Sequence, residues 1–144
     1  MVNKYNKAPI HVSEGKAFLD GVEVMDCVTC TITVAVQTWT GKQLGERTPS
    51  TKVTGYNPTV NITRRRNTPW LKEMFAKYIK EGKTPEFTIQ GIMQDEHSDY
   101  YSENGSDTVT AVGCVPTGNL TLLNLNASED ILEDQLTFNA KDII

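Results

Sequence analysis

The sequence predicts a mainly β domain, an antiparallel barrel or sandwich of six to eight strands with one flanking α-helix. Two observations predict this class. A single clean helical period runs through residues 68–81, and most other apolar residues alternate with polar ones at the two-residue period of a strand. With 144 residues and no linker, repeat or low-complexity segment, residues 1–144 are expected to form one domain.

The helix is expected to begin near Thr68 and to end at Gly82. Thr68 suits the cap of the first turn, Pro69 suits the first helical position, and Gly82 suits a left-handed stop. The apolar residues between them form one stripe at helical spacing: Leu71, Met74, Phe75, Tyr78 and Ile79. Because an isolated helix of this length is marginal in water, the stripe must lie on the apolar face of the strands.

The strands are expected to start after a loose N-terminal arm that ends at about Ser13. Asp20-Gly21 suits a type I′ turn between Lys16–Leu19 and Val22–Val24. The further expected strands are Cys27–Trp39, Pro58–Arg66, Pro85–Gln94, Thr108–Pro116, Asn119–Asn126 and Asp134–Ala140. Residues 95–107 are interpreted as a solvated hairpin tip, and residues 127–133 as an acidic turn that includes at most one helical turn.

The strand at Cys27–Trp39 is unusually long and has one apolar and one small polar face. Cys27 and Cys30 form a C-x-x-C at its start, where three-residue spacing is expected to direct the two thiols to opposite faces. Cys114 alone does not complete a zinc-binding set. We interpret all three cysteines as structural residues of a protein made in a reducing compartment.

The segment Thr40–Thr54 has two glycines, one proline and no apolar period. It is expected to be a long loop, and long loops inside compact domains are usually functional. Its Gly41-Lys42 lacks the residue order of a phosphate-binding loop. Arg64–Arg66 close the following strand, and two interpretations stand side by side: solvated charge, or salt bridges to an acidic surface on a partner.

Composition and motifs argue against several classes of function. A net charge of −4 gives no overall attraction to nucleic acid or to acidic membranes. No apolar run reaches membrane-spanning length, and the N-terminal residues lack the apolar segment of a signal peptide, so a cytosolic protein is expected. His11 and His97 are the only histidines and neither accompanies a nucleophile motif. We therefore predict no enzyme activity, no catalytic residue, no cofactor and no metal site.

Several segments together resemble the tail-tube proteins of contractile-tailed phages, in particular those of defective prophages and phage-tail-like bacteriocins. They are GKAFLDGVEV, the long Thr/Val strand, the basic glycine-containing loop, YNPTVNITRR and WLKEMFAKYIKEGKTPEFTIQG, in the same order from about Gly15 to about Phe138. The resemblance implies a β-barrel or sandwich subunit with a flanking helix. It also implies homohexameric rings that stack into the inner tube of a contractile injection system.

The same resemblance implies where the protein works and with what. Its partners would be further copies of itself, the sheath protein, and the baseplate and tape-measure proteins. The chain would be part of a virion or tail-like particle assembled in the bacterial cytoplasm, with no membrane partner. DNA would pass without specific binding in an infectious phage, whereas in a bacteriocin-like particle the tube would act as a puncturing rod.

Carried onto this chain, the resemblance implies two sets of functional residues. The lumen-facing set is Thr29, Thr31, Thr33, Gln37, Thr59, Asn61 and Thr63. The interface set is Thr40, Lys42, Arg47, Lys52, Arg64, Arg65 and Arg66. The loop at residues 40–54 would reach the next ring or a neighbouring subunit, where its basic residues would meet acidic segments such as 95–103 or 129–134. A hydroxyl- and amide-rich bore suits passage because each phosphate held by Lys or Arg adds affinity.

Two alternatives to a phage tube remain. A secretion-system tube protein would share the fold class. A ligand-binding β-sandwich, such as a carbohydrate-binding module, would need exposed aromatic side chains in line on one face, and the candidates are Trp39, Trp70, Tyr100 and Tyr101.

Overall fold

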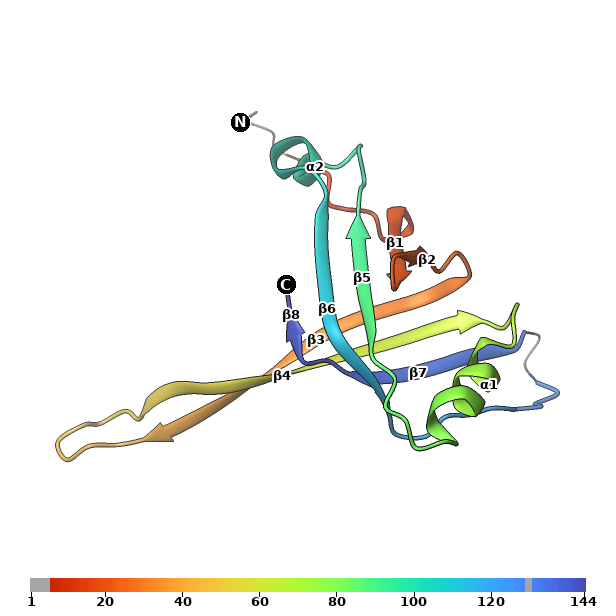
Figure 1. Cartoon of the computed structure of the whole chain (residues 1–144). Helices are drawn as coiled ribbons and strands as arrows, with labels where there is room; N and C mark the ends of the chain where they lie inside the picture. Colours follow the sequence, from red (N-terminus) through yellow and green to blue (C-terminus); the bar gives the residue numbers. More distant parts are fainter. Residues whose placement is uncertain (1–5, 129–130) are drawn as a thin grey trace.

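The fold is an antiparallel β-sheet structure from which one long hairpin projects (Figure 1). The computed structural model describes residues 6–128 and 131–144. Its strands are β1 (Gly15–Leu19), β2 (Val22–Glu23), β3 (Cys27–Gly41), β4 (Ser50–Arg65), β5 (Phe87–Met93), β6 (Asp107–Thr117), β7 (Glu133–Asn139) and β8 (Asp142–Ile143). The helical elements are η1 (Val12–Glu14), α1 (Trp70–Met74), η2 (Phe75–Ile79) and α2 (Asp99–Asn104). The predicted mainly β class with a flanking helix is confirmed.

Strand β6 joins the two parts of the sheet. The strand order is β2-β1-β5-β6-β7-β4-β3, with β8 beside β6. Most of β6 pairs with β5, but its last residues, Val115–Thr117, pair with β7 instead. Figure 1 shows the β5–β6 pair standing steeply across the β3–β4 pair, with α1 beside the corner where β6 changes partners. The core therefore lies between two layers that share one strand.

The core combines residues from both layers and from the helix. Its buried members are Val60, Ile62, Leu71, Met74, Phe87, Ile89, Ala111, Cys114, Leu136 and Phe138. The ring of Phe87 lies 5.7 Å from that of Trp70 and 6.0 Å from that of Phe138, in tilted and edge-to-face arrangements that aromatic pairs favour. The predicted apolar stripe of the helix accounts for Leu71 and Met74, while Phe75, Tyr78 and Ile79 are half-buried.

The end of the helix was predicted correctly, but its beginning was not. Gly82 adopts a φ of +76° and ends the helix as expected, after a π-helical turn at Phe75–Ile79 that the sequence did not reveal. The expected cap at Thr68 is wrong. Pro69 occupies the cap position without a side-chain hydrogen bond, and the Thr68 hydroxyl instead accepts a hydrogen bond from Arg64 Nη2 at 3.4 Å.

The segment Thr40–Thr54 is a β-hairpin, so the prediction of a loop without secondary structure is wrong. Strands β3 and β4 stay paired as far as Gly41 opposite Ser50, leaving only residues 42–49 as the turn. A register shift between Gln37 and Thr38 interrupts the ladder. No apolar period is present because neither face of this distal part is covered by the core. By contrast, the type I′ turn at Asp20-Gly21 is confirmed by positive φ angles at both residues.

The predicted strand at Asn119–Asn126 is absent. Gly118, with a φ of +74°, ends β6, and the following residues form no ladder as far as residue 128. Strand β7 pairs with β4 along its whole length on one edge, but on its other edge β6 pairs only with residues 137–139. The segment does not continue this second ladder: only Leu120 packs against the core, while Leu122, Leu123 and Leu125 are exposed. The acidic turn expected at residues 127–133 lies partly outside the described residues.

The connection at residues 95–107 joins the paired strands β5 and β6 and is largely exposed, as a solvated hairpin tip would be, and it also contains helix α2, which was not predicted. Ser98 caps it by accepting a hydrogen bond from the Tyr101 N–H at 3.1 Å. Asp95 is buried and accepts hydrogen bonds from the N–H groups of His11 (2.9 Å) and His97 (3.1 Å). The His11 contact, together with the hydrogen bond from the Asp99 N–H to the Ala8 carbonyl at 2.9 Å, attaches part of the expected loose N-terminal segment to this connection; residues 1–5 lie outside the described residues.

Candidate assembly surfaces

The outer face of β3, β4 and β7 carries the predicted lumen-facing residues. Cross-strand pairing places Thr29 opposite Thr63, Thr31 opposite Asn61, and Thr33 opposite Thr59. Gln37 continues the same face along β3. The alternate residues of these strands, such as Val60 and Ile62, enter the core. The structure therefore brings all seven predicted residues onto one face, directed away from the core.

Strand β7 extends this face with residues that sequence reasoning missed. Gln135, Thr137 and Asn139 lie opposite Thr63, Asn61 and Thr59, and the Thr137 hydroxyl donates to Asn61 Oδ1 at 2.9 Å. Their alternation with the core residues of β7 was visible in the sequence and would have identified them. From residue 29 to residue 37 and across to β7 the face carries hydroxyl and amide groups without charge, so it offers no ionic grip to a phosphate backbone.

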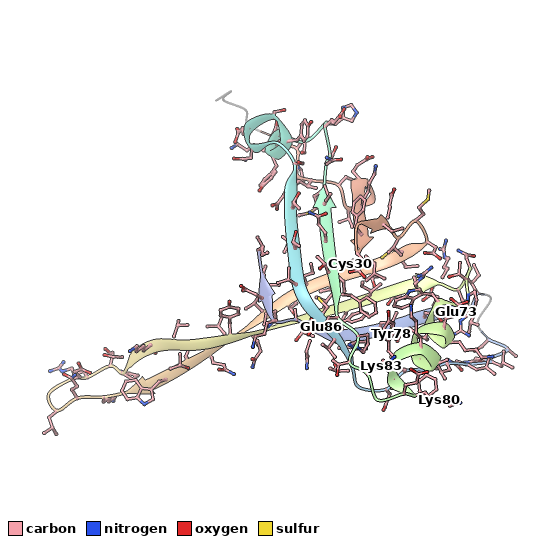
Figure 2. All side chains as sticks on the ribbon, in the orientation of Figure 1. Cys30, Glu73, Tyr78, Lys80, Lys83 and Glu86 are labelled. Carbon is pink, nitrogen blue, oxygen red and sulfur yellow. The ribbon has the colours of Figure 1, made fainter. Side chains whose placement is uncertain are left out.

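The distal part of the β3–β4 hairpin, residues 34–58, projects beyond the core and is the second candidate surface. We call this part the arm. Figure 1 shows it extending away from the rest of the molecule, and Figure 2 shows side chains standing free on both of its sides. Its exposed large apolar residues are Val34, Val36, Trp39, Leu44, Val53 and Tyr56. Exposed apolar groups gathered on one element mark an interaction site, and two strands alone are marginally stable in water.

Four of the predicted interface residues lie together on the arm. The hydroxyls of Thr40 and Thr51 are 3.3 Å apart across the strands. Lys52 lies opposite Trp39, and Lys42 and Arg47 belong to the turn. All four predicted residues are exposed. The arm is thus a basic hairpin with apolar side chains that its own chain leaves uncovered.

The three consecutive arginines do not act as a set. Arg64 Nη2 lies 3.1 Å from Asp26 Oδ2, and Arg66 Nη2 lies 2.6 Å from Asp134 Oδ1. Only Arg65 is exposed. Arg64 and Arg66 pair within their own chain, so the interpretation as solvated charge is wrong for these two residues, whereas pairing with a partner stays a prediction.

The carboxylates of these pairs explain why the arginines turn inward. Asp134 is 1% exposed and has the same strand parity as the buried Leu136. This parity in the sequence indicated a buried carboxylate, and a buried carboxylate needs a cation beside it. Burial raises the pKa of Asp26, but hydrogen bonds from Arg64 and Asn67 outweigh it and leave that pKa below its ordinary value. Arg64 also lies 5.9 Å from the centre of the Trp70 ring.

Cys27 and Cys30 share one face, so the prediction of opposite faces is wrong. A register shift between Cys27 and Thr29 inserts Val28 as an extra residue, which places both cysteines opposite core-facing positions of β4. Both pack against the core, and Cys30 is labelled in Figure 2. Burial raises the pKa of Cys30 to about 11 and also raises that of Cys27. The thiols are protonated at neutral pH, which supports the structural interpretation.

The residues considered for other functions are dispersed. Trp39 is on the arm, Trp70 packs on Phe87, and Tyr100 belongs to α2, so these aromatic candidates for carbohydrate stacking do not line up. Among residues 6–128 and 131–144, no group of three or more His, Cys, Asp or Glu side chains is placed to hold a metal ion. None of the helices within these ranges has the length and apolarity to cross a membrane.

Comparison with known proteins gives one family match and related sequences. The model of a family described as phage tail tube protein matches residues 4–143. The phage-like element PBSX protein XkdM of Bacillus subtilis (strain 168) is 28% identical over 129 residues, which cover 90% of this chain and 84% of that protein.

Solved structures share the fold over nearly the whole chain. A chain from the tube-terminating cap of the anti-feeding prophage superimposes with a TM-score of 0.73 at 11% identity, covering 99% of this chain and 94% of the other. A chain from the sheath/tube terminator of an extracellular contractile injection system, PVC, in its extended state gives a TM-score of 0.71 at 12% identity, covering 94% and 95%. At these identities the similarity shows the fold alone.

Proposed function

The chain belongs to the phage tail tube protein family, and from that premise we propose that it forms the inner tube of a contractile tail or tail-like particle. Membership makes it a structural component of such a particle and not an enzyme. In the proposal, homohexameric rings stack into a hollow tube inside a sheath. The tube serves either as a channel for DNA or as a puncturing rod.

The observation that carries the proposal is the uncharged polar face beside an open strand edge. Strand β3 has fifteen residues and, in the part of the chain that the structure describes, pairs only with β4. A long open edge presents unpaired backbone groups, which a neighbouring copy can complete. Joining copies edge to edge in a closed ring removes the open edges and turns the polar faces toward a common bore.

The proposed ring also gives the other surfaces a role. The arm, with Thr40, Lys42, Arg47 and Lys52, reaches an adjacent subunit, where its exposed apolar residues become covered. Arg65 lies at the exposed end of the polar face, in position for a subunit contact. The outside of the tube then meets the sheath, while baseplate and tape-measure proteins meet its ends and its bore. Where the tube is a channel for DNA, the DNA crosses the uncharged face without specific binding.

A second candidate is a ring that terminates the tube, since both structures described above are named as terminators. The two candidates differ in whether the subunit adds to its own kind indefinitely. A tube protein polymerises to open-ended cylinders, whereas a terminator stops at one ring and binds the end of a tube made by another protein.

Electron microscopy of the purified full chain, with sedimentation over a range of concentrations, tests the proposal. Hexagonal rings and hollow tubes of uniform diameter are the expected result. Rings that never elongate would favour the terminator. Tubes formed by a chain that is encoded with a secretion system would favour the secretion-system tube protein of the same fold. A monomer that stays compact at every concentration, above all one that binds glycans, would overturn the assembly function.

A further inference from the structure

A cavity of about 570 Å³ opens beside the β1–β2 hairpin, at the opposite end of the molecule from the tip of the arm (Figure 1). Its apolar lining comes from the β1–β2 hairpin and the two residues after it, from the start of the helix and from the start of β5: Leu19, Val22, Val24, Met25, Trp70 and Phe87. Met25 is 88% exposed and Val22 is also exposed, so this apolar lining is left open to water. An apolar hollow with exposed walls is a docking site for an apolar side chain.

The rim of this cavity is acidic. Asp20, Glu23 and Asp26 line it, against one cation, Arg64. Because Asp26 is paired with Arg64 at 3.1 Å, the charges of Asp20, whose Oδ1 accepts a hydrogen bond from the Thr88 N–H at 2.7 Å, and of Glu23 remain without a cation among the lining residues. The Nε of Arg64 is buried and makes no hydrogen bond among the described residues. The cavity therefore suits a partner that is apolar at its centre and basic around it.

The tip of the arm has this chemistry. Leu44 is fully exposed at the turn, between the basic residues Lys42 and Arg47. The turn is shaped by Glu46, whose carboxylate accepts hydrogen bonds from the Gln43 N–H at 3.1 Å and from the Ser50 hydroxyl at 3.5 Å. An apolar side chain flanked by two cations thus lies at the end of the long β3–β4 ladder.

We propose that Leu44 of one copy of this chain inserts into the cavity of a second copy, with Lys42 and Arg47 of the tip against Asp20 and Glu23 of the rim. The arm points away from its own cavity, so the contact joins two molecules. It is heterologous, with different surfaces on each side, and repeats from copy to copy as a ring or a stack requires. This contact rests on the proposed tube function only in one respect, because it requires that copies of the chain assemble.

The cavity is a better receiver for the basic tip than Asp95, Glu103 and Asp134, which belong to the two acidic segments expected to meet it. Asp95 and Asp134 are both buried, and Asp134 is also paired with Arg66, whereas Asp20 is exposed. Glu103 lies 3.9 Å from Lys7. Glu23, in contrast, is exposed at the rim and lies beside an apolar hollow that also accepts Leu44.

Cysteine cross-linking between two preparations tests the contact. L44C and M25C are purified separately, mixed, allowed to assemble and oxidised, and non-reducing electrophoresis is expected to show an intermolecular dimer that neither preparation gives alone. L44C mixed with L125C is the matched control, because Leu125 is 82% exposed but lies outside the cavity. The native cysteines are half-buried or buried, and all three are present in every sample.

A charge exchange distinguishes the proposed docking from chance proximity. R47E is expected to reduce the cross-link yield of the L44C and M25C pair several-fold, and E23K on the M25C chain is expected to restore it. Both side chains are exposed, so neither change disturbs the core. If the M25C chain carrying E23K gave the same low cross-link yield with the R47E variant as with the L44C chain that keeps Arg47, the result would contradict the pairing.

Electron microscopy of the same samples separates the two proposals. A pair-specific cross-link in rings or tubes supports both, and a pair-specific cross-link without them supports the contact and overturns the tube. Rings or tubes in which L44C links equally to M25C and L125C, or to neither, overturn the contact and leave the tube function standing. Absence of both the link and the assemblies overturns both.

Discussion

The two halves of the β3–β4 ladder have the same backbone pairing in different surroundings. Near the body, Ile32 lies opposite Val60, and this face belongs to a core that also contains residues of β5 and the helix. In the arm, Val36 lies opposite Tyr56 on the same face, and both side chains are exposed. The proximal half is therefore stabilised by burial within its own chain, whereas the arm holds apolar surface for a contact that another molecule supplies.

The largest expected effect comes from breaking the ion pair at the proximal end. Arg66→Ala leaves the buried Asp134 without its cation and is expected to lower the free energy of unfolding by about 3 kcal/mol, measured by denaturant titration. Arg65→Ala, at the exposed neighbour, is the control and is expected to change little. Replacing both partners, in Arg66→Met with Asp134→Leu, should recover much of the loss; a double variant as unstable as Arg66→Ala would contradict this account.

Hydrogen exchange measures the contrast along the ladder itself. Amides at residues 38–41 and 50–53 of the unassembled protein should exchange at least about a hundredfold faster than those at residues 30–32 and 60–62, a difference of about 2.7 kcal/mol. The reason is that distal hydrogen bonds open without exposing core. On assembly the difference should shrink. Equal protection in the monomer would mean that the arm needs no partner to be stable.

A matched pair of truncations on one face gives the next largest effect. Val60→Ala, at a position with 0% exposure, is expected to cost about 2 kcal/mol of unfolding free energy. Val36→Ala, at 59% exposure, is expected to cost less than about 0.5 kcal/mol in the same denaturant titration. If Val36→Ala raised the concentration needed for assembly while leaving monomer stability intact, the arm's apolar face would be assigned to contacts between copies.

The smallest effect concerns the hydrogen bond at the base of the arm, where the Tyr56 hydroxyl donates to Asp142 Oδ1 at 2.6 Å. This bond lowers the pKa of Asp142 and raises that of Tyr56. Its contribution is therefore full between the unfolded-state pKa values, about 4 to 10, and is lost as pH falls through the depressed Asp142 pKa or rises through the elevated Tyr56 pKa. In Tyr56→Phe, NMR titration should show Asp142 titrating at a higher pH; an unchanged midpoint would dismiss the bond.

The sequence predicted the elements whose pattern is imposed by the core. The stripe at Leu71 and Met74 and the alternation in Val60 and Ile62 were legible because burial on one face demands apolar residues at a fixed period. The seven polar residues of the outer face were predicted for the same reason, since they are the alternate positions of buried strands. Their role in a bore remains a prediction.

The sequence was misleading where no core imposes a pattern or where a single extra residue shifts it. The arm looked like a loop because both of its faces are exposed. The inserted Val28 reversed the expected orientation of Cys27 relative to Cys30, and the internal partner of Arg64, Asp26, lies on another element. The leucines after Gly118 looked like a strand, but the β6–β7 ladder stops at Thr117, just before Gly118 with its positive φ. Each of these outcomes depends on long-range pairing.

Strand β6 has a mechanical consequence for a subunit under load. One continuous peptide pairs with β5 along most of its length and with β7 at its end, so the two layers are joined by covalent bonds as well as by packing. Thrust applied to one layer reaches the other through this peptide, and the layers cannot slide apart without tearing several ladder hydrogen bonds at once. A cylinder built from such subunits would resist shear during a sudden stroke.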